Sequence, residues 1–312
     1  MRRLIINADG YGFTAGISRA IDECVDFGTV RSLSANVNFS HVDSLCDLVR
    51  RHPELSVGCH LNPIVGRPVL PLAKVPSLVD KNGEFFYRDF MGRYFRGKIK
   101  LTELRAEMAA QLEKTRDLAG DAFSHVDFHM GLHRLPGLYA AFLDVVEKSG
   151  VGRIRTHKYR VGLEHKFPRL RHSLFLFESF TRIPKYIYIL WLRRKALRHG
   201  FAMPDLWVGI SHMDPQNLTI QNYLLMLKNI PDGVNEFVAH PAYVDEDLTR
   251  WSNYHEGRIL ERQILLSPVF RQALASSDVQ LVGYRDIPLP HEQAYRSVSR
   301  KIGLRNSLDI ES

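Results

Sequence analysis

Short apolar runs alternate with longer helical runs through most of the 312 residues, and this alternation constrains the fold more than any other feature. The runs with strand character cover residues 4–8, 30–38, 55–61, 124–129, 151–156, 206–211, 234–239 and 279–284. The helical runs cover residues 14–27, 41–51, 102–118, 136–148, 219–228 and 254–275. This alternation predicts an α/β fold with a parallel sheet, either doubly wound or closed as a (β/α) barrel.

Two segments interrupt the alternation. Residues 62–100 contain several prolines and glycines and are predicted to form a long loop or lid. Residues 159–201 form a second insertion, whose part 179–198 is aromatic and basic but has too short an apolar run to cross a membrane. This part is expected to pack on the barrel as a helix; peripheral contact with a membrane or a lipid-linked substrate is the alternative. We expect a single domain over residues 1–290 and a polar tail over 291–312.

Polar side chains recur where the predicted strands end. Asp9 ends the first strand, His60 the third, His129 the fourth and His240 a late one, and residues 125–133 alone hold three histidines and an aspartate. The carboxyl ends of parallel strands form one rim of a barrel or one crevice of an open sheet, where active sites lie. Imidazole is the commonest protein ligand of catalytic metals. The pattern therefore favours a metal-dependent enzyme over strand-end histidines that only bond the backbone.

The balance of charge bears on the partners. The chain has 42 basic and 34 acidic residues, and its net charge of +8 favours an anionic partner. It has neither zinc-finger spacing nor a basic stripe with stacking aromatics, so we expect no nucleic acid partner. Arg258 and Arg262, one helical turn apart, could bind a substrate carboxylate or phosphate, but a solvated helix face is expected.

The cysteines bear on the compartment. Cys24, Cys46 and Cys59 are few and odd in number, which predicts a reducing environment without a disulfide framework. The first apolar run is too short for a signal peptide, so a cytoplasmic protein is expected. The oligomeric state is left open, with a homodimer as one option.

Five segments together carry a resemblance. In chain order they are LIINADGYGFTAGISRAI, SVGCHLNPIVGRPVLP with VPSLVDKNGEFF, HVDFHMGLHRLP, NEFVAHPAYVDEDL and the closing LVGYRDI. From Leu4 to Pro288 the chain resembles the YdjC-like carbohydrate deacetylases, which include chitooligosaccharide deacetylases and a hopanoid-associated branch. The resemblance implies a distorted (β/α) TIM-like barrel that removes an N-acetyl group from an acetylated amino sugar. It also implies a divalent metal, commonly Mg²⁺, with Zn²⁺ or another divalent ion as the alternative.

The same resemblance implies roles for individual residues. The metal histidines of the family match His60 and His129, an aspartate of its NADDFG motif matches Asp9, and its late histidine matches His240. Two features differ from the family pattern. The second aspartate of NADDFG is replaced by Gly10, and the middle histidine of D-x-H-x-H-x-H is replaced by a glycine.

A mechanism follows as a hypothesis. His60 and His129 hold the cation, with Asp9 as a further ligand or as the base, and His240 as an imidazolium protonates the leaving amine. Asp127 is expected to orient an imidazole.

Three further residues are candidates for the substrate side of the pocket. His133 is expected at the sugar or at the pocket edge. Tyr11 and Tyr243 are candidate rings for sugar stacking, with ordinary packing as the alternative.

Two other classes of function compete with the deacetylase. A different metal-dependent barrel enzyme, such as a sugar isomerase or an amidohydrolase, would be expected to show other ligands at the strand ends. A non-catalytic sugar-binding relative is the third hypothesis, because Gly10 removes a carboxylate that the family has.

Overall fold

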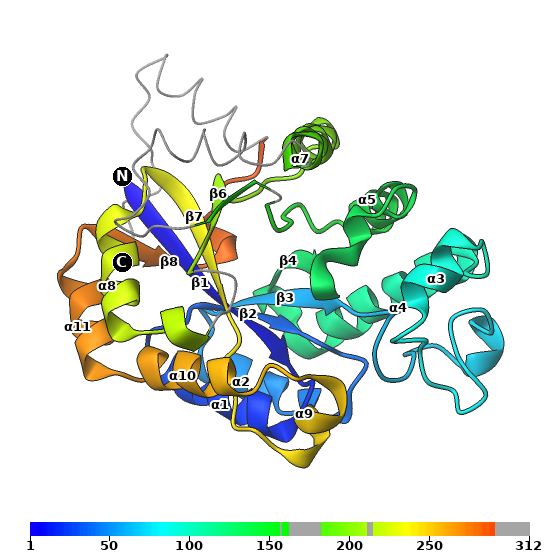
Figure 1. Ribbon diagram of the computed structural model, residues 1–312, viewed down its shortest axis with the longest axis horizontal. Helices are drawn as coiled ribbons and strands as arrows, with labels where there is room; N and C mark the ends of the chain where they lie inside the picture. Colours follow the sequence, from blue (N-terminus) through cyan, green and yellow to red (C-terminus); the bar gives the residue numbers. More distant parts are fainter. Residues whose placement is uncertain (157, 162–181, 211–214, 291–312) are drawn as a thin grey trace.

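Eight strands paired in parallel form the central sheet of the computed structural model (Figure 1). The structure describes residues 1–156, 158–161, 182–210 and 215–290. The strands are β1 (Arg2–Tyr11), β2 (Ser32–Ala35), β3 (Ser56–Leu61), β4 (Phe123–Phe128), β5 (Tyr159–Val161), β6 (Leu206–Gly209), β7 (Gly233–Ala239) and β8 (Val279–Val282). Their parallel pairing confirms the predicted α/β class.

β1 lies at the centre of the sheet, whose order is β4-β3-β2-β1-β7-β6-β5. One edge of β1 pairs with β7, and the other edge is shared by β8 at its start and β2 at its end. Beyond β4 the sheet continues through two parallel bridges, Val126 with Ile154 and Arg153 with Ala202. Because Ala202 leads into β6, these bridges draw the two ends of the sheet together, as in a distorted barrel. The strand predicted over 151–156 is therefore reduced to bridges.

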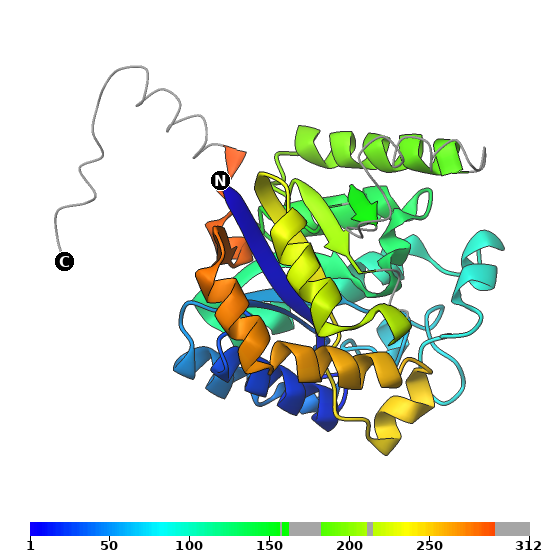
Figure 2. The same ribbon diagram turned by 60° about the vertical axis from the view of Figure 1, so that its left-hand side comes forward.

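Helices surround the curved sheet (Figure 2). They are α1 (Ala15–Asp26), α2 (Leu45–Arg51), α3 (Phe90–Phe95), α4 (Leu101–Ala119), α5 (Leu138–Lys148), α7 (Arg182–Arg198), α8 (Ile220–Asn229), α9 (Glu246–Trp251), α10 (Glu256–Leu265) and α11 (Pro268–Ser276). Thr14 caps α1 by accepting a hydrogen bond from the Ile17 N–H at 3.2 Å. The helix predicted over 254–275 is two helices, because Pro268 has no N–H and starts α11.

The hydrophobic core lies between the sheet and these helices. In β1, Leu4, Ile6 and Ala8 point to this core. Side chains alternate across a strand, so the intervening Asn7 and Asp9 point to the other face of the sheet.

That other face is polar toward the carboxyl ends of the strands, whereas Ile5, Val234 and Val282 belong to a small apolar cluster near their starts. Residues paired in register point the same way, and they place Asp9 beside Ser34, Ser34 beside Gly58, and His60 beside Asp127. Gly58 leaves room for the His125 ring, because a Cβ at this position would lie 2.3 Å from His125 Nε2. The alternation thus separates an apolar core from a buried polar interior that leads to the rim.

Both insertions contain secondary structure in their described residues. Residues 62–100 include α3 and a 3₁₀ turn at Leu72–Lys74. The second insertion opens with β5 and closes with α7, while residues 162–181 and the tail 291–312 lie outside the described residues. Within the described parts of the chain, no helix is long and apolar enough to span a membrane.

Candidate active site and metal centre

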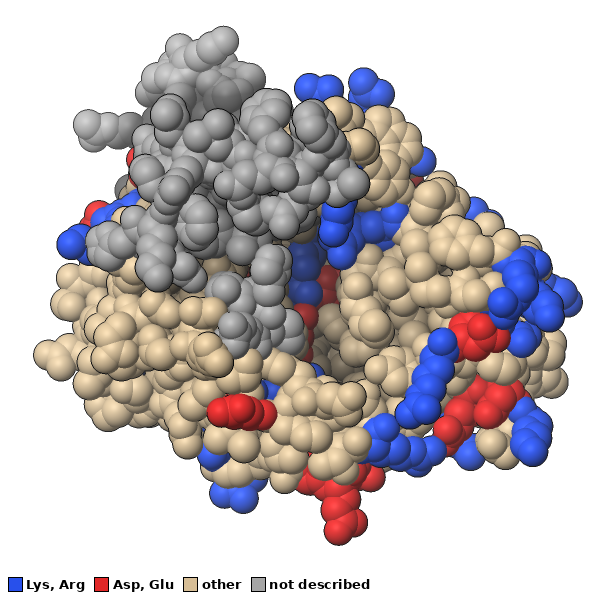
Figure 3. Space-filling view, in the orientation of Figure 1, with Lys and Arg blue, Asp and Glu red and all other residues tan. Residues whose placement is uncertain are grey.

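The four residues predicted at strand ends meet in one pocket of about 650 Å³. Asp9 lies near the end of β1, His60 lies in β3, and His129 and His240 directly follow β4 and β7. Figure 3 shows the surface hollowed near the centre of its face, where basic and acidic side chains meet. Residues that are distant in the chain are therefore brought to one rim, as the parallel sheet requires.

Arg155 is the charged centre of this site. Its guanidinium donates to both Asp9 oxygens, at 2.6 and 2.7 Å, and to Glu236 Oε1 at 2.8 Å. It also lies 2.6 Å from Asp127 Oδ2. Burial alone would raise the pKa of Asp9, but the charge of Arg155, with His60, outweighs it and holds that pKa below its usual value. Asp9 is therefore a firmly ionised carboxylate.

The other two carboxylates around Arg155 differ in protonation. For Asp127 too, Arg155 and then His60 outweigh burial and lower the pKa. Glu236 lies deeper, and burial dominates there, raising its pKa to about 7. One cation thus faces two ionised carboxylates and a third group that is partly protonated near neutral pH.

His60 and His129 face each other through ring nitrogens. His60 Nδ1 lies 2.7 Å from Asp127 Oδ1 and so carries a proton toward that carboxylate. Its Nε2 then lies 3.3 Å from His129 Nδ1. Burial lowers the pKa of His129 to about 3, with the neighbouring His60 as the next cause, so this ring is neutral.

The donor set fits a divalent metal. Two ligand nitrogens bound to one ion at about 2.1 Å and near a right angle lie about 3 Å apart, close to the His60–His129 spacing. Asp127 on the far nitrogen of His60 matches the carboxylate–histidine arrangement that orients metal ligands. Ligand atoms of Asp9, His60 and Asp127 also lie within 4.8 Å of one another. Because Arg155 already holds Asp9 and Asp127, we favour the two imidazoles as direct ligands, with Asp9 beside them.

The turn after β4 sets the position of His129. Met130 and Gly131, which follow it, have φ angles of 56° and 63°, in the left-handed region. A non-glycine residue in this region is unusual and marks a locally constrained turn. His129 is therefore the residue directly before a constrained turn.

His240 has a different environment. Its backbone N–H donates to Glu261, and its Nδ1 lies 3.8 Å from Glu261 Oε2. Burial, followed by the positive Arg258, lowers the pKa of His240 to about 3. Burial also raises the pKa of Glu261 to about 7. The imidazolium predicted for His240 is therefore not its form in this environment, where the ring is neutral.

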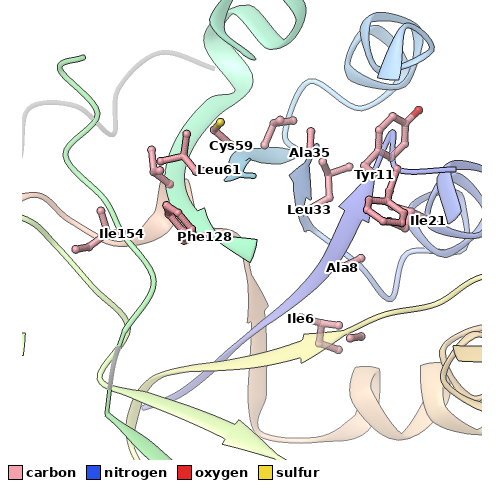
Figure 4. Close-up of a cluster of buried hydrophobic side chains, with 14 of the residues drawn as sticks. Ile6, Ala8, Tyr11, Ile21, Leu33, Ala35, Cys59, Leu61, Phe128 and Ile154 are labelled. Atoms are coloured by element: carbon pink, nitrogen blue, oxygen red, sulfur yellow. The ribbon is translucent and has the colours of Figure 1, made fainter. Parts of the chain in front are cut away.

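Tyr11 and Tyr243, predicted to stack on the sugar, do not line the pocket. The register of β1 with β2 shifts between Asp9 and Tyr11, and this bulge at Gly10 turns Tyr11 into the core. Figure 4 labels Tyr11 there beside Ile21. Tyr243 instead donates to Glu23 Oε2 at 2.7 Å.

Two of the three other residues that the sequence singled out, His133 and Arg258, line the pocket. His133 lines the pocket, where it packs against Phe142 with ring centres 4.6 Å apart. Arg262 stacks on the Tyr243 ring at 3.7 Å, whereas Arg258 lines the pocket. The expected solvated helix face for Arg258 is thus wrong.

Several functional candidates were missed by sequence reasoning. Arg155 and Glu236 carried a usable signal, because each is a charged residue within a run of strand character. The aromatic wall of the pocket carried none, since its members come from separate loops, a strand and a helix. They are Phe13, Tyr87, Trp207, Trp251 and Tyr254.

Comparison with known proteins identifies the family of this chain. The family model "YdjC-like protein" matches residues 3–276. The carbohydrate deacetylase of Thermoanaerobacter pseudethanolicus is 26% identical over 91% of this chain and 98% of its own length. The mouse (Mus musculus) carbohydrate deacetylase is 29% identical over 91% and 94%. The chitooligosaccharide deacetylase of Yersinia enterocolitica is 30% identical over 91% and 98%.

A solved structure is also similar. It is that of a proposed cellobiose-phosphate cleavage protein from Enterococcus faecalis V583, with a TM-score of 0.68 and 25% identity over 91% of this chain and 97% of that one. The match of the family model covers nearly all of the strand-end residues and the helices between them. The resemblance carried by the five motifs is thereby confirmed: this chain belongs to the YdjC-like protein family.

Proposed function

We propose that this protein is a metal-dependent carbohydrate deacetylase. It hydrolyses the N-acetyl group of an acetylated amino sugar, carried on an oligosaccharide or a glycolipid. The observation that carries the proposal is the pair of imidazole nitrogens, 3.3 Å apart, in the same pocket as an ionised Asp9. The relatives named carbohydrate deacetylase and chitooligosaccharide deacetylase support the reaction class.

His60 and His129 are proposed to hold the cation, with Asp9 beside them. A bound divalent ion would polarise the amide carbonyl and make a water molecule more acidic. Mg²⁺ is the ion that the family resemblance implies, whereas two imidazole donors are more typical of Zn²⁺. Metal titration distinguishes these two ions.

The remaining chemistry belongs to side chains of this chain. Asp9, oriented by two hydrogen bonds from Arg155, is proposed to accept the proton of the attacking water. The leaving amine needs a proton, and His240 is proposed to deliver it. Because the pKa of His240 is low, its protonated form is scarce but gives up a proton readily. His240 must therefore be protonated during turnover. Asp9, after it has accepted the proton of the attacking water, is the proposed source of that proton.

The pocket wall supports a sugar substrate. Tyr87 and Trp251 line it with their rings edge to face, 6.2 Å between centres. Such rings bind the apolar faces of sugars, while nearby polar groups select the hydroxyls. We also propose a cytoplasmic location, supported by three cysteines that form no disulfide.

A non-catalytic sugar-binding relative is the second candidate. It is favoured by Gly10, whose φ of 104° suits glycine and which supplies no carboxylate to a cation.

Acetate release from N-acetylglucosamine oligomers tests the two candidates. The protein is assayed after chelation and after adding back Mg²⁺ or Zn²⁺, beside the His129→Ala and Asp9→Asn variants. Metal-dependent acetate release that both substitutions abolish supports the deacetylase. Oligomer binding by calorimetry, without acetate release under any metal, would establish the binding protein instead.

A further inference from the structure

Helix α7 presents two unlike faces. Its inner face packs on the body of the protein through Ile189, Leu192 and Ala196, which are all buried. The Tyr188 hydroxyl holds the helix further by donating to the Arg134 carbonyl at 2.7 Å. The helix is therefore firmly seated, and its outer face is free of the core.

The outer face exposes large apolar side chains. Ile187 is 60% exposed and Trp191, one turn later, is 53% exposed. Leu197, nearer the end of the helix, is 48% exposed. Single exposed apolar residues are ordinary on a protein surface, but Ile187 and Trp191 are four residues apart and therefore neighbours on α7, a helix at the edge of the molecule (Figure 2).

Basic side chains accompany this apolar stripe. Arg194, Lys195 and Arg198 follow Trp191 within two turns, and none of the 17 residues of α7 is acidic. The Lys195 ammonium lies 5.6 Å from the centre of the Trp191 ring. Tryptophan and basic side chains are the residue types that favour the headgroup layer of a membrane.

We propose that the outer face of α7 docks the protein on an anionic lipid bilayer. Ile187 and Trp191 enter the headgroup layer, and Arg194, Lys195 and Arg198 bind lipid phosphates. Charge complementarity favours an anionic bilayer, because this helix face carries three basic side chains and no acidic one. A protein partner would need a broader apolar core than this narrow stripe supplies.

Docking also positions the pocket. Lys185, in the first turns of α7, lines the pocket from the same helix. The pocket wall and the docking face are thus only a few residues apart in one rigid element. Binding through α7 brings the pocket close to the bilayer surface, where a sugar attached to a lipid headgroup lies.

Sedimentation with lipid vesicles tests the proposal. The wild-type chain should bind vesicles of phosphatidylcholine mixed with phosphatidylglycerol, release them at high salt, and bind pure phosphatidylcholine weakly. Removing the three cations by Arg194→Gln, Lys195→Gln and Arg198→Gln should weaken binding on the order of 100-fold, at about fivefold per basic residue. The Trp191→Glu variant should weaken it by about tenfold or more.

Two matched controls separate α7 from general surface effects. Val269→Glu changes an apolar side chain of α11 that is 56% exposed, and it should leave vesicle binding unchanged. Removing three other exposed cations by Arg96→Gln, Lys98→Gln and Lys100→Gln should have a much smaller effect than the α7 triple variant.

Vesicle binding needs neither metal nor substrate, so this test is independent of the proposed deacetylase activity. The docking proposal is overturned if the wild-type protein does not bind anionic vesicles, or if the α7 variants bind them as tightly as the wild-type protein does. Self-association that depends on Trp191, measured by analytical ultracentrifugation, would also overturn it by assigning this face to a second copy of the chain.

Discussion

Arg155 and Asp9 are joined by two parallel hydrogen bonds of 2.6 and 2.7 Å, although 146 positions separate them in the chain. The same guanidinium holds Asp127 and Glu236. This one cation therefore compensates three buried carboxylates while it orients the proposed base. Its removal should affect both folding and catalysis, and these two effects can be measured separately.

The Arg155→Met variant should lose about 3–5 kcal/mol of unfolding free energy at neutral pH, because breaking a buried ion pair leaves uncompensated charge. Urea denaturation followed by circular dichroism measures the loss. Arg155→Lys keeps the charge but not the bidentate geometry, and should recover part of the stability with little of the activity. An unchanged stability of Arg155→Met would refute the role assigned to this guanidinium.

Gly10→Asp should strengthen metal binding. It restores a carboxylate to a residue that lines the pocket, and a Cβ there would meet its nearest atom at 3.6 Å, so space is available. Mutating a residue that hydrogen-bonds a metal ligand typically lowers the metal affinity about 10–100-fold. A direct ligand should therefore contribute at least about tenfold to that affinity. Calorimetric titration of the metal measures the gain.

Gly10→Ala is the matched control for this substitution. Both variants carry a side chain at a φ of 104°, and both should lose about 1–3 kcal/mol of stability to backbone strain. Only the aspartate variant should gain metal affinity. Equal affinity in the two variants would show that position 10 does not reach the ion.

The convergence of the strand-end residues was predictable from the sequence. Asp9, His60 and His240 each follow an apolar run, and a parallel sheet must bring such positions to one rim. Their order in the sheet did not need to be known, since every strand end of a parallel sheet lies on the same side.

The structure differs from the sequence prediction at Tyr11, Arg155 and His240, and each difference has a physical cause. Tyr11 was a candidate for sugar stacking, but the bulge at Gly10 turns its side chain into the core. Arg155 lies in the predicted strand over 151–156, but its partner carboxylates come from β1, β4 and β7, and their approach depends on how the sheet curves. The neutral state of His240 depends on burial and on Arg258, which no local pattern reveals.

His125 should make folding stability fall in mild acid. Burial lowers its pKa to about 3, and its ring stacks on Tyr284 with centres 3.7 Å apart. The unfolded chain binds a proton near the ordinary value of about 6.5. This contribution is therefore complete above pH ~6.5 and is lost at about 1.4 kcal/mol per pH unit as the pH falls toward ~3.

His125→Asn removes this titration. Urea denaturation of both proteins at several pH values, without metal, measures the difference in their unfolding free energies. The advantage of the wild-type protein should shrink as the pH falls, at the slope given above. A difference that stays constant with pH would mean that folding does not lower the pKa of His125.

Trp251→Ala should weaken substrate binding more than turnover. Trp251 lines the pocket but lies on α9, which carries none of the proposed ligands or proton-transfer groups. The loss of one aromatic contact costs about 1–2 kcal/mol, so KM for an N-acetylglucosamine oligomer should rise about 5- to 30-fold. kcat should stay within a few-fold, because a ring that binds substrate and transition state equally contributes to KM alone.

Trp191→Ala is the control for this prediction, since it removes another indole that lies on α7 and does not line the pocket. With a water-soluble oligomer it should leave both kinetic constants unchanged. A lowered kcat with unchanged KM in Trp251→Ala would instead place this ring against the reacting group. The aromatic wall would then take part in positioning the acetamide, and the sugar would have to bind elsewhere in the pocket.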